Sequence, residues 1–386
     1  MNTELITLIH GTPGHWVTAI TGGGSTALSR LLSAPGASRT LLEATVPYAQ
    51  TALTAYLGKT PAQAASSETA RALAMAAFQR ARGLTEPQET TASDAGQGMA
   101  TPLFGLGASA ALVTDRSRRG DDHCFVAIQS HLASWEFSLT FGKTGRQRSE
   151  QEQICGDLIL QAMQMAQSGH HIPRTDDLRQ GLGLDTDDHV TVRVLTAPTL
   201  WQGLFNGEHK STWVAAELPL GVFPGAFNPL HEGHRQMVAV AKEILGHEVI
   251  LEISAFNVDK PPLDYFDLQE RELGTEGYPM VFSNAPTFIE KSFVFPAATF
   301  VVGSDTIERI ADPKYYGNQV ASRDAALGLL QQRGHRFLVF GRSDGERFIG
   351  LEHLELPPSL RAICDGVPEA RFRIDLASRH LRQHLS

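Results

Sequence analysis

Cysteine and long apolar runs are scarce in this chain. Its three cysteines, Cys124, Cys155 and Cys364, are widely spaced, which excludes a disulfide framework and a CxxC metal-ligand set. No stretch approaches the roughly 18 to 20 uninterrupted apolar residues that a membrane span needs. The start of the chain lacks a basic segment leading into an apolar one, so we expect no signal peptide. These absences predict a cytoplasmic protein with reduced thiols.

Positive charge is also in short supply. Lysine and arginine number 33 against 42 aspartates and glutamates, so the formal net charge is −9. Such a chain lacks the electrostatic footprint of a nucleic-acid-binding protein. A hydrophobic content of 42% argues against disorder, and 386 residues suggest roughly two domains. We expect no nucleic-acid or membrane partner, while a homo-oligomer remains open.

Composition divides the chain into three parts. Residues 1–168 are rich in Ala, Ser, Thr and Gly, and the run SSETARALAMAAFQRARG predicts a helix that ends at Gly83. Residues 169–217 begin with a cluster of Pro, Gly and charge and form a connector that could pack against either half, with one strand in VTVRVLTA. Residues 218–386 form the second domain.

The second domain alternates strand-like and helical patterns. Strands are expected in VFPGAF, EVILEISAF, ATFVVGS and HRFLVFGR, and helices at 232–245 and 325–333. This alternation is typical of a parallel sheet covered by helices. The fold class predicted for the chain is therefore α/β.

The clearest chemical signal is the run GVFPGAFNPLHEGH at 221–234. A strand enters a turn, and His231 and His234 flank Gly233 where a helix begins, so amides and imidazoles can donate to a phosphate. A zinc site of the HExxH type is excluded because the histidines are three apart. A strand–turn–helix junction with incidental histidines is the plainer alternative. The nucleotide-binding candidates in this run are Gly225, Phe227, Asn228 and Gly233.

This run resembles the HxGH signature of the nucleotidylyltransferase superfamily, and further segments resemble nicotinamide-mononucleotide adenylyltransferases. They are NVDKPPL with Lys260, VVGSD with Gly303 and Asp305, LVFGR with Arg342, and IDLASRHLR with Ser378 and Arg382. The resemblance implies a Rossmann-like parallel sheet. Two features depart from the family: Ala377 and Arg379 replace hydroxyl residues, and the chain stops at Ser386.

The resemblance implies adenylyl transfer from ATP to nicotinamide or nicotinate mononucleotide, with pyrophosphate leaving. His231, His234, Lys260 and Arg382 would be catalytic, and Mg²⁺ would accompany ATP without a metal site on the protein. Transfer to another phosphorylated acceptor stays open, with phosphopantetheine, or with CTP and a polyol phosphate. A non-catalytic nucleotide-binding regulator is the third alternative.

Residues 5 to 165 resemble the C-terminal amidase domain of the CinA family, also known as nicotinamide-nucleotide amidase. The resemblance rests on AITGGGS at 19–25, RLLSAPGAS at 30–38, VPY at 46–48 and the SSETARALA helix. The candidate site residues are Thr21, Gly22, Gly23, Gly24, Ser25 and Tyr48. The family's nucleophilic serine aligns with Thr21 and its lysine with Leu53, which cannot accept a proton. We therefore expect a structural or nucleotide-sensing domain, although a shifted alignment would use Ser25 or Lys59.

Overall fold

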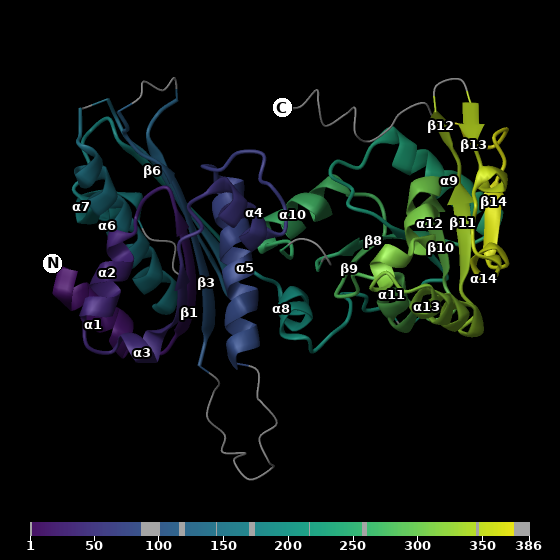
Figure 1. The fold of residues 1–386 in the computed structure, drawn as a ribbon, viewed down its shortest axis with the longest axis horizontal. Helices are drawn as coiled ribbons and strands as arrows, with labels where there is room; N and C mark the ends of the chain where they lie inside the picture. Colours follow the sequence, from purple (N-terminus) through teal and green to yellow (C-terminus); the bar gives the residue numbers. More distant parts are fainter. Residues whose placement is uncertain are drawn as a thin grey trace, which may run out of the picture. The chain divides into compact units, whose positions relative to one another are not determined.

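The computed structural model describes residues 2–85, 101–115, 120–143, 145–169, 174–215, 217–256, 261–344 and 347–373 (Figure 1). The chain forms two compact units. Unit 1 comprises Met1–Gln202 together with Asp259–Asp267, and unit 2 comprises Gly203–Val258 and Leu268–Ser386. The segment 169–217, expected to be a connector, is thus divided between the two units at Gln202.

Unit 1 is built on a mixed sheet of six strands in the order β2-β1-β3-β4-β5-β6. Strands β2, β1 and β3 run parallel, whereas β3 to β6 are antiparallel neighbours. The strand predicted from VTVRVLTA is confirmed as β6. The strands are β1 (His15–Thr21), β2 (Leu41–Thr45), β3 (Leu103–Ala111), β4 (His123–Gln129), β5 (Ala133–Thr140) and β6 (His189–Thr196).

Helices pack on both faces of this sheet. On one face, α1 (Asn2–Gly11), α2 (Thr26–Ser33), α6 (Arg148–Gln167) and α7 (Thr175–Leu182) share an apolar core with the strands. On the other face lie α4 (Gln50–Leu57) and α5 (Ser67–Thr85). The short α3 (Ala37–Thr40) precedes β2, and α8 (Thr199–Asn206) spans the division between the units.

The close approach of α5 to β3 follows from small residues on both elements (Figure 1). A Cβ atom on Gly105 would lie 2.1 Å from the backbone nitrogen of Phe78, and one on Gly107 would lie 2.1 Å from the carbonyl oxygen of Ala70. The alanines of α5 face these glycines. The predicted helix is confirmed, but it continues through Gly83 to Thr85, since a helix interior tolerates glycine at a cost of only about 1 kcal/mol.

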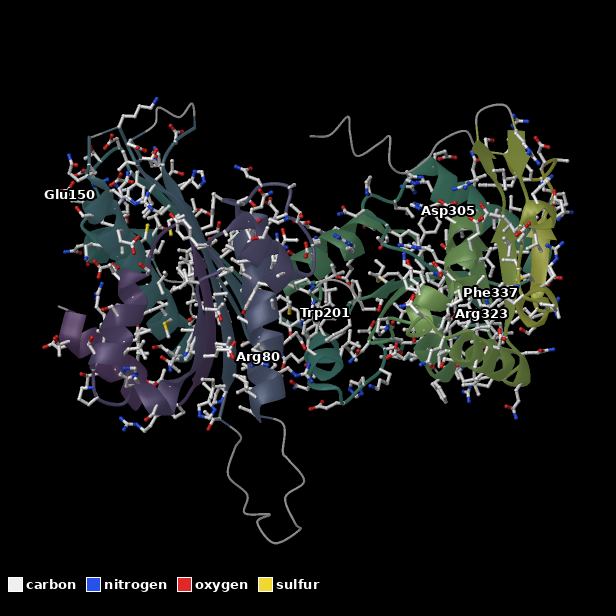
Figure 2. All side chains as sticks on the ribbon, viewed as in Figure 1. Arg80, Glu150, Trp201, Asp305, Arg323 and Phe337 are labelled. Carbon is white, nitrogen blue, oxygen red and sulfur yellow. The ribbon has the colours of Figure 1, made fainter. Side chains whose placement is uncertain are left out.

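Unit 2 contains a fully parallel sheet of six strands in the order β14-β11-β10-β7-β8-β9. Phe337 of β11 is fully buried in its core, where its ring lies 5.8 Å from that of Phe300 (Figure 2). All four strands predicted in this half are confirmed. The strands are β7 (Gly221–Pro224), β8 (Val249–Ser254), β9 (Met280–Ser283), β10 (Thr299–Gly303), β11 (Arg336–Phe340) and β14 (Cys364–Val367).

The helices of unit 2 connect these parallel strands. They are α9 (Glu232–Leu245), α10 (Tyr265–Gly274), α11 (Phe288–Val294), α12 (Ser304–Ala311), α13 (Val320–Gln332) and α14 (Pro358–Arg361), with 3-10 turns η1 (Pro313–Tyr316) and η2 (Leu351–His353). A separate hairpin joins β12 (Arg342–Asp344) to β13 (Arg347–Ile349). The α/β class is confirmed. Among the described residues, no helix is both long and apolar enough to cross a membrane.

The strand order of unit 2 defines where a ligand can bind. After β7 the chain builds β8 and β9 on one side, and it then returns to place β10 and β11 on the other side of β7. In open parallel sheets, ligands bind outside the carboxyl ends of the strands where the order reverses in this way. In this sheet that point lies between β7 and β10, so the residues following these two strands are the ones to inspect.

Candidate active site

The segment after β7 is a tight turn that leads directly into α9. The backbone N–H of Gly225 donates to the carbonyl oxygen of Glu252, which holds the turn on β8. A Cβ atom on Gly225 would lie 2.6 Å from the ring of Phe227, so glycine leaves room for that ring. Phe227 itself has a positive φ of 41°, and the Asn228–Pro229 peptide is cis. These residues fold the chain sharply before the helix begins.

His231 and His234 face each other at the start of α9. Their ring centroids are 3.7 Å apart with an interplanar angle of 21°, so the rings stack. The backbone N–H of His231 donates to Nδ1 of His234 at 3.3 Å. Because Nδ1 accepts this bond, the neutral ring of His234 carries its proton on Nε2. Nε2 is then a hydrogen-bond donor, as a phosphate oxygen requires.

The surroundings of the pair keep both rings neutral. Burial, together with the charge that a protonated His231 would carry, lowers the pKa of His234 to about 4. Burial also lowers the pKa of His231. The ring of Phe227 meets His234 edge-on with centroids 5.1 Å apart. Near pH 7 the two imidazoles therefore act as neutral donors beside the N-terminus of a helix, whose first-turn amides include that of the buried Gly233.

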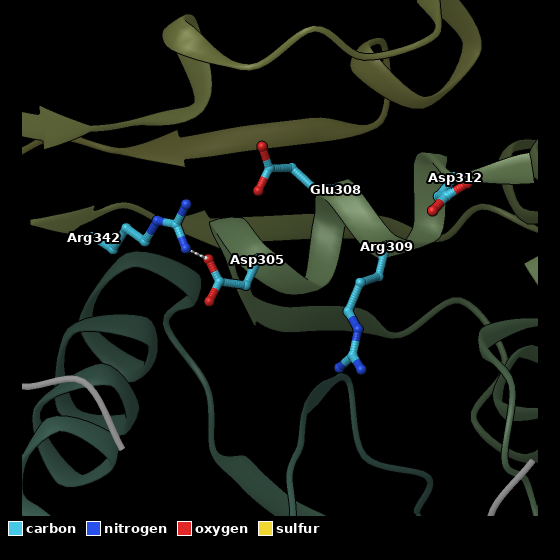
Figure 3. A pocket seen from close by; sticks show the side chains of 5 residues that line it. All are labelled: Asp305, Glu308, Arg309, Asp312 and Arg342. Carbon is cyan, nitrogen blue, oxygen red and sulfur yellow. Dashed lines mark hydrogen bonds and ion pairs between the residues drawn. The ribbon is translucent and has the colours of Figure 1, made fainter. Parts of the chain in front are cut away.

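The residues after β10 form the second part of the candidate site. Gly303 ends the strand and is the N-cap of α12, and Asp305 lies in the first turn of that helix. Arg342, at the start of β12, forms an ion pair with Asp305 (Figure 3). Ser304 is buried, and its Oγ has no hydrogen-bond partner within the part of the chain that the structure describes. Asp305 and Arg342, which the sequence analysis gave as separate candidates, are thus brought together at one edge of the sheet.

A hollow of about 360 Å³ opens beside this ion pair (Figure 3). Its lining side chains are Asp305, Glu308, Arg309, Asp312 and Arg342. Three carboxylates against two guanidinium groups make the hollow slightly acidic. It therefore suits hydroxyl and amine groups better than a whole triphosphate, which would need cations in addition to Arg309 and Arg342.

Four of the expected site features cannot be placed. Lys260, Ser378, Arg379 and Arg382 lie outside the described residues. Their roles in holding phosphate groups remain predictions.

The candidate residues of unit 1 gather around a hollow of about 520 Å³. Its lining includes Thr21, Gly22, Gly23, Ser25 and Tyr48, and it also includes Arg148 and Glu152 of α6. Sequence reasoning missed these two residues of α6. They are far from the glycine-rich turn in sequence, and no local pattern marks them.

Glu152 occupies the amides that the glycine-rich turn would offer to an anion. Its carboxylate accepts hydrogen bonds from the backbone N–H of Gly24 at 2.8 Å and of Thr26 at 3.1 Å, and from Oγ of Ser25 at 2.8 Å. The hydroxyl of Thr21 donates to the carbonyl oxygen of Pro47, which is not a base. The turn therefore already has an anionic partner within the protein.

No protein-held metal site is seen in the described ranges. There, no group of three or more His, Cys, Asp or Glu side chains is arranged to hold a metal ion. Mg²⁺ usually relies on substrate phosphates and only one or two carboxylates. An ion that accompanies ATP would thus be held mainly by the substrate phosphates.

Comparisons with known proteins support the chemistry of unit 2. Residues 222–334 match the cytidylyltransferase-like family. The matched range includes His231, His234, Gly303 and Asp305, whereas Arg342 lies beyond it. The match supports nucleotidyl transfer as the general type of reaction. A search of curated proteins found no match.

One solved structure similar to this chain is that of a competence-damaged protein (CinA) superfamily protein from Escherichia coli. The two are 14% identical, and the alignment covers 44% of this chain and 87% of that chain with a TM-score of 0.27.

Proposed function

We propose that this protein transfers an adenylyl group from ATP to the phosphate of nicotinamide or nicotinate mononucleotide, forming a dinucleotide and pyrophosphate. The observation that carries the proposal is the stacked pair of His231 and His234 at the N-terminus of α9, directly after the central strand β7. Two neutral imidazoles and a helix N-terminus in one place suit an anionic phosphoryl group.

In the proposed reaction, an oxygen of the mononucleotide phosphate attacks the α-phosphorus of ATP. The new P–O bond forms as the bond from that phosphorus to the bridging oxygen of the β-phosphate breaks, and pyrophosphate carries away the electron pair. Negative charge grows on the α-phosphoryl oxygens. His231 and Nε2 of His234 donate to those oxygens, and the fixed hydrogen bond at Nδ1 keeps His234 oriented to do so.

The other proposed contacts with ATP are of two kinds, one to its ribose and one to its triphosphate. The slightly acidic hollow at Asp305 suits the ribose hydroxyls of the nucleotide. Arg342, Lys260, Ser378 and Arg382 would hold the triphosphate, and Mg²⁺ bound to that triphosphate would supply further neutralisation of its charge.

A second candidate function is cytidylyl transfer from CTP to a polyol phosphate or another phosphorylated acceptor. The cytidylyltransferase-like match over residues 222–334 favours keeping it. A substrate panel run on the full chain separates the candidates by pyrophosphate release and product mass. We expect release with ATP and the mononucleotide, and a dinucleotide mass. Release only with CTP and a polyol phosphate would favour the second function, and tight nucleotide binding without product would favour a regulator.

We propose a non-catalytic role for the hollow of unit 1. Glu152 fills the anion-binding amides, and Leu53 is packed in the apolar core beside α5, where it offers no base. The carboxylate of Glu152 is already engaged by two backbone N–H groups and by the hydroxyl of Ser25. Incubation of the full chain with nicotinamide mononucleotide should release no ammonia. Steady ammonia release that is lost in Ser25→Ala would overturn this proposal.

A further inference from the structure

The hollow beside Asp305 extends along one face of α12. The lining residues Asp305, Glu308, Arg309 and Asp312 stand three, four and seven positions apart, and residues at this spacing share a helical face. At a rise of about 1.5 Å per residue, the distance from the first of them to the last is roughly 10 Å. Arg342 adds to the lining where it pairs with Asp305. The hollow therefore runs from this ion pair along the helix for about the length of a nucleoside.

Glu308 and Arg309 stand on the two sides of this hollow. Figure 3 shows their side chains projecting to opposite sides of α12, with the pair of Asp305 and Arg342 toward one end and Asp312 toward the other. Both side chains are exposed. Within the part of the chain that the structure describes, the carboxylate of Glu308 has no hydrogen-bond or ion-pair partner. A carboxylate and a guanidinium group thus flank an open space.

The far end of the hollow is held in shape by the turn η1. Nε of Arg309 donates to the hydroxyl of Tyr315 at 3.3 Å, and Oδ1 of Asp312 accepts the backbone N–H of Lys314 at 3.0 Å. These bonds occupy one nitrogen of Arg309 and one oxygen of Asp312. Among the described residues, Nη1 and Nη2 of Arg309 have no hydrogen-bond partner. The guanidinium group is therefore fixed at one nitrogen and has two others with which it can donate to a ligand.

These groups match the edges of an amino-bearing nucleobase. With the ribose hydroxyls at Asp305, as proposed above, the base extends along α12 between Glu308 and Arg309. The volume of about 360 Å³ lies within the range of small-molecule sites. A carboxylate can only accept hydrogen bonds and a guanidinium group can only donate them. The exocyclic amine of adenine suits the first and its ring nitrogens suit the second, whereas an oxo group in place of the amine would face a carboxylate that repels it.

We propose that this hollow selects the nucleobase of the triphosphate by its exocyclic amine. Glu308 accepts a hydrogen bond from the amine and determines specificity, and Arg309 donates to a ring nitrogen on the opposite edge and contributes affinity. The inference rests on the proposed function and names the substrate class of its nucleotide site, the amino-bearing nucleoside triphosphates. Cytosine also carries an exocyclic amine, so the same two residues suit CTP in the second candidate function.

The test compares ATP with inosine triphosphate, in which an oxo group replaces the amine, as substrates of the full chain. We expect the wild type to use ATP with a kcat/KM about tenfold or more above that for inosine triphosphate, because a lost hydrogen bond to a charged group has about this effect. Glu308→Gln should bring the two values within about threefold, since its amide can donate to the oxo group. Glu243→Gln alters an exposed carboxylate near the other end of α9 and should keep the wild-type ratio.

The variant Arg309→Gln separates affinity from specificity. Both purines keep the ring nitrogen that Arg309 contacts, so the KM for each should rise by a similar factor, about fivefold, and the ratio of the two kcat/KM values should stay as in the wild type. A wild-type ratio near one would overturn the proposal, and so would an unchanged ratio in Glu308→Gln. A change of the ratio in Glu243→Gln as large as that in Glu308→Gln would also contradict it.

A separate outcome concerns the proposed function itself. If the wild type transfers only from CTP, the comparison becomes CTP against UTP, with the same expected ratios. If it transfers from neither ATP nor CTP, that function fails, and calorimetry with ATP and inosine triphosphate then tests base selection alone. Tighter binding of ATP by the wild type, with the preference lost in Glu308→Gln, supports the selection. Equal binding of the two nucleotides, or binding of neither, overturns it.

Discussion

The backbone N–H of His231 donates to Nδ1 of His234, and the two rings stack with their centroids 3.7 Å apart. This bond determines which nitrogen of His234 carries the proton and leaves Nε2–H as the ring's donor. The second histidine of the motif is thus oriented by the backbone of the first. The spacing of the two residues in the sequence is what makes this geometry available.

The pH dependence of stability should reveal the neutral state of His234. The pKa of His234 is lowered from 6.5 to about 4 in the folded protein, so between these values the unfolded chain binds more protons. The stability that His234 contributes is then fully present above about pH 6.5 and is lost as the pH falls toward 4. After allowance for partial exposure we expect a loss of about 1–2 kcal/mol. Urea unfolding at pH 7 and pH 4.5 should show a smaller loss for His234→Asn than for the wild type, and equal losses would contradict this account.

The buried ion pair between Lys291 and Glu252 should be important for the stability of unit 2. Nζ of Lys291 donates to both carboxylate oxygens of Glu252 at 2.7 and 2.8 Å, and both side chains are almost fully buried. Lys291→Met leaves a buried charge without its partner, which should cost about 3–5 kcal/mol in urea unfolding. The double variant with Glu252→Gln should recover much of this loss.

The exposed pair between Lys242 and Glu248 provides the matched control for this prediction. Lys242→Met should cost less than about 1 kcal/mol. If both lysine variants lost equal stability, burial would not be the reason.

Helix α5 packs so closely on β3 that an added methyl group between them should destabilise the protein. Gly105→Ala places a Cβ atom against the backbone of α5, so the helix must shift, and we expect a loss of about 3 kcal/mol. Gly83→Ala, within the same helix and with open space around it, should instead stabilise the protein by about 0.5–1 kcal/mol. Thermal unfolding of the two variants checks both signs. A neutral Gly105→Ala would show that the two elements are not in close contact.

The ion pair between Arg342 and Asp305 should matter for the nucleoside triphosphate and not for stability. Both side chains are about half exposed, so Arg342→Gln should change the free energy of unfolding by less than about 1 kcal/mol. It should raise the KM for ATP by about tenfold. Arg336→Gln breaks a similarly exposed pair with Asp365 and should leave that KM unchanged. Equal effects of the two variants on the KM would argue against a role for Arg342 in binding.

Local patterns in the sequence were sufficient for part of this structure. The strands of unit 2 were found from their apolar runs, and the histidine pair was found from the strand–turn–helix run that resembles the HxGH signature. The GSD segment and Arg342 were named because each follows a strand and resembles a family segment, and parallel pairing of β10 with β11 then brings these two strand ends together.

Contacts between distant segments could not be found in this way. Glu152 meets Ser25 from a helix near the other end of unit 1, and nothing in the glycine-rich turn indicates that a carboxylate will occupy its amides. Arg71 and Asp264 likewise come together only through the tertiary fold. A boundary drawn from composition cannot show that residues 259–267 return to unit 1, because that depends on contacts made far away in sequence.

The central claim is that the histidine pair performs nucleotidyl transfer, and the most direct test is the rate of pyrophosphate release from ATP and the mononucleotide by the full chain. We predict a dinucleotide product for the wild type and for His247→Ala, which alters a histidine whose Nδ1 lies 3.1 Å from the carbonyl oxygen of Glu248. His234→Ala should lose about a hundredfold or more in kcat while keeping its circular dichroism spectrum. Full activity of His234→Ala would contradict the account.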